Sequence, residues 1–310
     1  MDFDFNEEQK MLKRSVHDFL ASECPHTLVR EIDESKQDYS RDIYRKMADL
    51  GWSGLMIPEE YGGVGGNWVD MAVFYEEAGR ALLQSPHFYT VVQAGQTILE
   101  LGNDEQKKEY LPGIAGGDLV MSVALTEPEV HCDLNAISTT AEKKGEDYII
   151  NGTKAFIGYA HLADYIITAA KSREGVSLFL VDGKAEGLTA TPIDTMGGER
   201  LCEVIYNNVR VPERRVIGDL GKGSAITGVI NKAKIMTCTK MVGAAEAALN
   251  MAVEYSKFRV QFGVLIGTFQ ALQFKMADML MALDGARYIT YYAAWLNSEG
   301  LPSEREMSMA

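Results

Sequence analysis

Hydrophobic residues recur at helical spacing through residues 5–118. In the first helix that this spacing predicts, an apolar residue falls about every third or fourth position: Phe5, Leu12, Val16, Phe19 and Leu20. Two capping boxes are predicted at helix starts, Asn6 with Gln9 and Asn103 with Gln106. Gly116-Gly117-Asp118 interrupts the helical pattern. We therefore expect an all-helical N-terminal domain over residues 1–118.

From about Leu119 to Pro212 the pattern changes to short apolar runs between turn residues. The segment YIINGTKAFI predicts two strands joined by a turn at Asn151-Gly152, because Asn-Gly is the strongest short hairpin signal. Three further runs have the composition of strands: ADYIITAAK, VSLFLVD and CEVIYNNVRVP. We expect a middle β-domain, a barrel or a sandwich, over residues 119–220.

Helical spacing returns after Gly221. A first long helix is predicted over residues 224–258, about 50 Å at 1.5 Å per residue, and a second over 268–297. Ser303 with Glu306 predicts the capping box of a third helix. Two long helices cannot bury both their faces, so we expect a helical bundle over 221–310 that a further C-terminal segment or a partner chain completes. The fold class is α+β and multidomain.

Composition and charge exclude several classes of function. The chain has 310 residues, and its net charge of -14 argues against nucleic-acid binding, which needs clustered Lys and Arg, and against docking on anionic membranes. No run of about 18 apolar residues predicts membrane insertion. The acidic start MDFDFNEEQK lacks the basic and apolar regions of a secretory signal, so we expect a cytoplasmic protein.

The cysteines and a glycine-rich run suggest no additional site. Cys24, Cys132, Cys202 and Cys238 form no Cys-x-x-Cys pair and do not cluster with the five histidines, so no metal site and no disulfide framework is expected. The run GGVGG at residues 62–66 lacks the Gly-Lys-Ser/Thr of a phosphate-binding loop, and a tight turn is the better interpretation.

Five motifs occur in a fixed order along the chain: IPEEYGG, ALTEP, YIINGTKAFI, NNVRVP, and RVQFG followed by FQALQFKMADM. With the helical, β, helical order of domains, these motifs make the whole chain resemble the acyl-CoA dehydrogenase family. The resemblance implies FAD bound between the β-domain and the C-terminal bundle. It also implies a homo- or heterotetramer, an acyl-CoA substrate oxidised to the enoyl-CoA, and an electron-transfer flavoprotein as electron acceptor.

The resemblance assigns seven positions to FAD: Leu125, Thr126, Phe156, Gly158, Arg259, Phe262 and Gln270. The first two hold the flavin's polar edge, Phe156 flanks its ring, and Arg259 reaches the FAD pyrophosphate of a neighbouring subunit. Gly158 departs from the family, which usually has a Ser or Thr whose hydroxyl bonds the flavin near N5. A backbone N–H or Tyr159 is expected to compensate.

The resemblance also assigns three positions to the acyl-CoA. Cys132 stands where the family has a serine that contacts the substrate, within a segment, Glu129-Val130-His131-Cys132, that replaces a glycine-rich run. Asn231 and Lys234 match positions near the CoA chain. Small residues at Gly158, Thr237 and Cys238 suggest a wide pocket for a bulky, cyclic or aromatic acyl group.

The catalytic base is not identified by the sequence. In most of the family it is a glutamate in the last helices, which here would lie beyond Ala310; in a minority it lies early in the first long helix, and the matching position is Ala233. Two hypotheses stay open: a conventional dehydrogenase, or a non-catalytic or half-site subunit of a heteromeric dehydrogenase. A flavin monooxygenase of the same fold is a third, less favoured interpretation.

Overall fold

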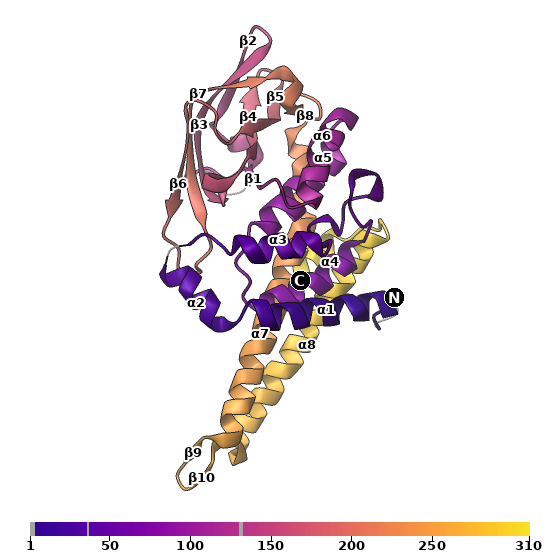
Figure 1. Ribbon diagram of the computed structural model, residues 1–310, viewed down its shortest axis with the longest axis vertical. Helices are drawn as coiled ribbons and strands as arrows, with labels where there is room; N and C mark the ends of the chain where they lie inside the picture. The colour runs from indigo at the N-terminus through magenta and orange to yellow at the C-terminus, as the bar shows by residue number, and fades with distance from the viewer. Residues whose placement is uncertain (1–3, 36, 130–132) are drawn as a thin grey trace. The chain divides into compact units, whose positions relative to one another are not determined.

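The structure, a computed structural model, describes residues 4–35, 37–129 and 133–310 (Figure 1). The α-helices are α1 (Glu7–Glu23), α2 (His26–Glu34), α3 (Arg41–Asp49), α4 (Trp68–Arg80), α5 (Gln96–Leu101), α6 (Asp104–Ala115), α7 (Ile226–Phe258), α8 (Gln270–Ser298) and α9 (Glu304–Met309). A π-helical segment, Phe88–Gly95, leads into α5. The expected order of helices, strands and helices is confirmed, and the fold is α+β.

The strands are β1 (Met121–Ala124), β2 (Thr140–Lys144), β3 (Asp147–Gly158), β4 (Tyr165–Ser172), β5 (Gly175–Asp182), β6 (Leu188–Ile193), β7 (Leu201–Pro212), β8 (Val216–Ile217), β9 (Val260–Gln261) and β10 (Val264–Leu265). Eight of them form one sheet in the order β6-β7-β3-β2-β4-β5-β8, with β1 parallel to β4. β9 and β10 form a separate hairpin.

The chain divides into two compact units. The helical unit comprises Met1–Glu31, Asn67–Leu83 and Asn231–Ala310, and the sheet unit comprises Ile32–Gly66 and Gln84–Ile230. The core of the sheet unit is formed by side chains that alternate along the strands, such as Tyr148 with Ile150 and Val204 with Tyr206. Along β7 and the first part of β3 this alternation places one row of side chains in the interior, whereas β1, β4 and β5 are buried along nearly their whole length.

The turn predicted at Asn151-Gly152 is wrong. β3 runs unbroken through both residues, and the turn that joins it to β2 is at Gly145-Glu146. Asn151 and Gly152 instead lie at a shift in register between β3 and β7, where Asn151 Oδ1 accepts from the backbone N–H of Asn208 at 2.8 Å. A Cβ atom on Gly152 would lie 2.5 Å from Thr139 Oγ1, so this glycine permits a bulge rather than a turn.

Two of the three capping boxes predicted from the sequence are present in the structure. Both reciprocal hydrogen bonds of the capping box are present at Asn6 and at Asn103. The third prediction is wrong, because Ser303 makes no side-chain capping bond and its hydroxyl donates to Asn297 Oδ1 at 3.2 Å instead. Helix α9 nevertheless begins at the next residue.

Close helix packing in the helical unit depends on two glycines. A Cβ atom on Gly79 of α4 would lie 2.0 Å from the carbonyl oxygen of Lys240, and one on Gly243 of α7 would lie 1.8 Å from that of Glu76. Only glycine therefore lets α4 and α7 approach so closely. Beyond this crossing, α7 and α8 run side by side to the β9–β10 hairpin (Figure 1). No helix in the described part of the chain is long and apolar enough to cross a membrane.

Candidate functional site

The predicted flavin loop follows β1 and lies along β3. The carbonyl oxygen of Thr126 accepts from the backbone N–H of Ala155 at 3.0 Å, and that of Leu125 accepts from Lys154 Nζ at 3.1 Å. Both loop residues remain partly exposed. The structure thus brings Leu125 and Thr126 together with Phe156, the residue that follows Ala155 in β3.

A buried ion pair fixes this loop. Lys154 and Glu127 are 0% and 3% exposed, and Lys154 Nζ lies 2.9 Å from Glu127 Oε1. The same carboxylate accepts from the backbone N–H and hydroxyl groups of Ser138, at 2.6 and 2.7 Å, and of Thr139, at 3.0 and 2.6 Å. Five hydrogen bonds to the Glu127 carboxylate therefore replace the water that this buried charge has lost.

The pKa values follow from this geometry. Burial alone opposes ionisation of Glu127, but its hydrogen bonds from Lys154, Thr139 and Ser138 outweigh burial and lower the pKa to about 2. Burial lowers the pKa of Lys154, against the opposing effect of Glu127. Sequence reasoning missed this pair, although a lysine inside the apolar run YIINGTKAFI was a visible signal.

Phe156 is held in an uncommon conformation at the exposed side of this region. Its φ is 60°, a left-handed value that costs a non-glycine residue about 1–3 kcal/mol, and its side chain is 59% exposed. Tyr159 also has a positive φ, 53°, but its side chain is buried. Strain of this kind persists where the surrounding structure enforces it, here so that a large flat ring faces outward from β3.

Gly158, between these residues, does not open the wide space that the sequence suggested. A Cβ atom there would come within 2.2 Å of Cζ of Tyr89, so the ring of Tyr89 already fills the place. Whether the backbone N–H of Gly158 or Tyr159 replaces the missing hydroxyl at the flavin stays a prediction; the space beside Gly158 itself is filled by Tyr89. Sequence reasoning missed Tyr89, which is remote from Gly158 along the chain.

The predicted residues of α7 lie in the helical unit. Lys234 Nζ donates to Asn231 Oδ1 at 2.8 Å, so the two predicted CoA contacts are one turn apart and paired. Ala233 is 1% exposed, and its methyl side chain offers no base. Cys132, the predicted substrate contact, lies outside the described residues, as do Val130 and His131.

The remaining predicted FAD residues cluster at the connection between α7 and α8. Arg259 follows α7, Phe262 is in the β9–β10 turn and Gln270 is the first residue of α8; all three are exposed, Phe262 to 91%. Phe262 and Gly263 have φ values of 55° and 80°, as a two-residue hairpin turn requires. The ring of Phe262 meets that of Phe269 edge-on at 6.3 Å.

Cys238 lines an apolar groove of about 550 Å³ between α7 and α8. Met241, Leu249, Met279 and Leu283 also line it. The small residue at 238 thus contributes to open space, whereas the glycine at 158 does not.

A thiol, an imidazole and a carboxylate are aligned elsewhere in the sheet unit. His161 Nδ1 lies 3.1 Å from Cys202 Sγ, and His161 Nε2 lies 2.7 Å from Asp38 Oδ1. The order is that of a nucleophile, a base and an orienting acid. The sulfur, however, is wholly buried, and burial raises the pKa of Cys202, so the thiol stays protonated and unreactive. Among the residues described, no group of His, Cys, Asp and Glu could hold a metal ion.

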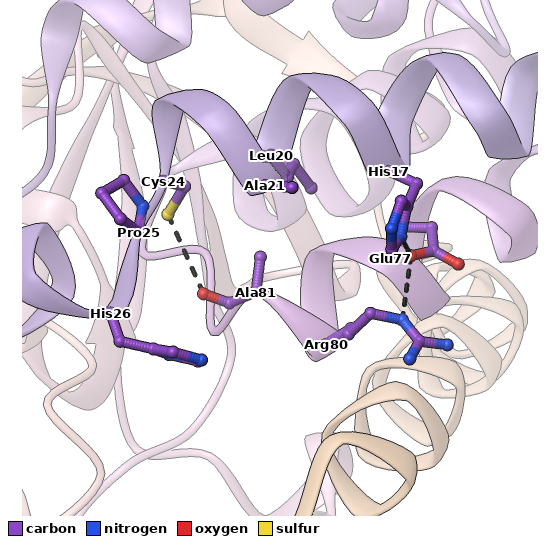
Figure 2. A pocket seen from close by; sticks show the side chains of 9 residues that line it. All are labelled: His17, Leu20, Ala21, Cys24, Pro25, His26, Glu77, Arg80 and Ala81. Carbon is purple, nitrogen blue, oxygen red and sulfur yellow. Dashed lines mark hydrogen bonds and ion pairs between the residues drawn. The ribbon is translucent and has the colours of Figure 1, made fainter. Parts of the chain in front are cut away.

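A pocket of about 340 Å³ between α1 and α4 contains none of the predicted site residues (Figure 2). Figure 2 shows His17 and Arg80 converging on Glu77, at 2.9 and 3.0 Å, and Arg80 also pairs with Glu246. Glu77 is 2% exposed, and its charge is matched by these neighbours. This pocket is best explained as part of the packing of α1 on α4.

Comparison with known proteins gives matches over nearly the whole chain. Family models described as the N-terminal, middle and C-terminal domains of acyl-CoA dehydrogenase match residues 6–118, 122–209 and 221–310. The chain is 35% identical to a probable acyl-CoA dehydrogenase, YngJ, of Bacillus subtilis, with 100% of the chain and 84% of the relative covered.

Two further similarities concern partners and ligands. The chain is 33% identical to CarC of Acetobacterium woodii, a subunit of a caffeyl-CoA reductase–Etf complex, with 99% of the chain and 83% of the relative covered. It is 28% identical, with a TM-score of 0.93, to the solved structure of PigA with FAD and proline, and that match covers 100% of the chain and 84% of PigA.

Proposed function

Since the chain belongs to the acyl-CoA dehydrogenase family of oxidoreductases, we propose that it binds FAD and oxidises an acyl-CoA thioester to the α,β-enoyl-CoA in the cytoplasm. The electrons then pass to an electron-transfer flavoprotein; the relative CarC belongs to a complex with such a partner. We also propose that the chain has three domains, over residues 1–118, 119–220 and 221–310.

One observation carries the FAD assignment. The ends of β1 and β3 place a partly exposed threonine, Thr126, beside an exposed aromatic ring, Phe156, and a buried ion pair fixes the loop between them. A hydroxyl both donates and accepts, which suits the mixed polar edge of a flavin, and a flat ring suits its face. The chemistry of these two side chains therefore fits the flavin.

Each residue has a defined task in the proposed reaction. FAD, when bound, supplies the acceptor for the hydride that leaves the β-carbon of the acyl group. Leu125 and Thr126 orient the cofactor's polar edge, and Phe156 shields one face of its ring from water. Asn231 and Lys234 contact the CoA. Because Ala233 cannot accept a proton, the α-proton is removed by a carboxylate that α7 does not supply at that position.

The exposed residues at the α7–α8 connection are assigned to a second subunit's cofactor. Arg259, Phe262 and Gln270 lie too openly to form a pocket by themselves, whereas a guanidinium and an amide suit a pyrophosphate. We assign them to the FAD of a neighbouring copy in a tetramer. Removal of any one should then weaken FAD binding only in the assembled protein.

FAD content and substrate-dependent bleaching test the proposal. The purified chain should carry flavin absorbance, lose it on anaerobic addition of an acyl-CoA, and reduce an electron-transfer flavoprotein. Thr126→Ala should lower the FAD content, whereas Thr191→Ala, an exposed threonine on β6, should not. A folded chain that binds no flavin and changes with no acyl-CoA would refute the assignment.

The alternative of a half-site subunit uses the same exposed residues with a different partner. The exposed positions Arg259, Phe262 and Gln270 would be completed in this alternative by a different chain rather than by a second copy. If FAD binding and turnover need a second, different chain, the heteromeric interpretation is correct. If the reduced protein reacts with oxygen and hydroxylates its substrate, the monooxygenase interpretation replaces both.

A further inference from the structure

Gly158 and Tyr89 share one space in the sheet unit. A Cβ atom built on Gly158 would lie 2.2 Å from Cζ, 2.3 Å from Cε1 and 2.4 Å from Cε2 of Tyr89. These are the atoms at the end of the ring that carries the hydroxyl. Any larger residue at 158 would therefore have to displace the phenol end of Tyr89.

Tyr89 is held in this position from several sides. It lies in the π-helical segment Phe88–Gly95, a rare geometry that is frequent at functional sites. Its ring packs at 5.9 Å from that of Tyr159 and 5.3 Å from that of Phe88. Its side chain also hydrogen-bonds Glu199, and burial raises its pKa, so the hydroxyl stays protonated and donates to the carboxylate.

The backbone beside Tyr89 is arranged around the same point. Phe156 and Tyr159, on either side of Gly158, both have left-handed φ values. The carbonyl oxygen of Gly158 accepts from Ser122 Oγ at 2.7 Å, which ties it to β1, the strand that leads into Leu125 and Thr126. Tyr89 thus lies against Gly158 at the end of β3, the strand that also carries Phe156, and this point is tied by Ser122 to the strand that precedes Leu125 and Thr126.

We propose that Tyr89 is a specificity-determining residue of the acyl site. Its ring stands where a side chain at residue 158 would stand, and so forms a wall beside the reacting end of the acyl group. The inference rests on the proposed FAD site at Thr126 and Phe156. It predicts that acyl groups branched next to the reacting carbons meet the ring, whereas unbranched ones pass beside it.

Substrate preference is the first readout. In Tyr89→Ala the ratio of kcat/KM for a β-branched acyl-CoA to that for its straight-chain isomer should rise about tenfold or more, because pocket walls discriminate by about that factor per methylene. Tyr89→Phe keeps the ring and should keep the ratio. The control is Tyr110→Ala, which removes another buried tyrosine of the same unit and should leave the ratio unchanged.

Urea unfolding is the second readout and needs no flavin. Gly158→Ser should lower the midpoint in the wild-type background, and much less in the Tyr89→Ala background, where the space is free. An unchanged substrate ratio in Tyr89→Ala, or an equal effect of Gly158→Ser in both backgrounds, would overturn this inference alone. A folded wild-type chain that binds no FAD would overturn the proposed function and the specificity role with it.

Discussion

The two groups of residues assigned to FAD differ in how the chain supports them. Leu125, Thr126 and Phe156 are fixed within the sheet unit by hydrogen bonds and by a buried ion pair. Arg259 and Phe262 are exposed at the end of two long helices. The first group is thus positioned by the folding of the sheet unit. The second group is positioned only by the β9–β10 hairpin, and its side chains are exposed.

This difference separates the effects that substitutions should have. Damage around β3 should appear first as lost stability, because the groups that position the loop are themselves buried. Damage at the α7–α8 connection should leave the folded chain intact and appear as lost FAD binding or assembly, because exposed side chains contribute little to folding. Four substitutions test this distinction.

The largest effect is expected when the buried ion pair is broken. Lys154→Met leaves the Glu127 carboxylate buried without its cation and should cost about 3–5 kcal/mol of unfolding free energy, measured by urea denaturation. The control is Lys143→Met, which removes an exposed ion pair with Glu213 and should cost less than about 1 kcal/mol. Equal effects of the two variants would contradict a role for the buried pair.

The buried pair should also make the stability of the protein depend on pH, because the pKa of Glu127 is lower in the folded state than in the unfolded state. The pKa of Glu127 is about 2 in the folded chain and ordinarily 4.5, so below pH 4.5 only the unfolded state gains a proton. The stability that this group contributes is complete above pH 4.5 and is lost as the pH falls towards 2, by about 1.4 kcal/mol per unit.

Urea unfolding of wild type and Glu127→Gln, measured from neutral pH down to acid, isolates this contribution. The difference between the two should be constant above pH 4.5 and should shrink below it. A difference that stays constant through the acid range would show that Glu127 titrates in the folded state as it does when unfolded.

Local signals in the sequence predicted most of the secondary structure. The boxes at Asn6 and Asn103 satisfy backbone groups within three residues, so sequence spacing alone defines them. The turn expected at Asn151-Gly152 failed for the opposite reason. Whether Asn-Gly forms a turn or a bulge depends on pairing with β7, which the local sequence does not encode.

The site shows the same limit more sharply. Resemblance of motifs selected Leu125, Thr126 and Phe156, which the structure does bring together. The resemblance did not reveal the partner of Lys154, which is 27 positions away, or the ring that fills the space at Gly158. Both depend on contacts between segments that are distant in sequence. From the sequence alone, Gly158 was therefore interpreted as leaving open space, whereas in the structure the ring of Tyr89 fills that space.

The proposed role of Arg259 predicts an effect on FAD rather than on folding. Arg259→Ala removes a charge-assisted contact to the pyrophosphate and should weaken FAD binding about tenfold to a hundredfold, measured by FAD titration of the apoprotein. Its unfolding midpoint in urea, measured without FAD, should stay that of wild type, since the side chain is exposed. Arg173→Ala, in the turn between β4 and β5, is the matched control and should change neither quantity.

The smallest expected effect concerns assembly. Phe262→Asp places a charge on the ring position that the proposal buries against a neighbouring copy, and should raise the dissociation constant of the assembly at least about tenfold, measured by sedimentation. Met196→Asp charges a fully exposed apolar position in the sheet unit and should leave assembly unchanged. If both variants assemble like wild type, the α7–α8 connection is not an interface, and its exposed residues would have to serve the FAD of their own chain.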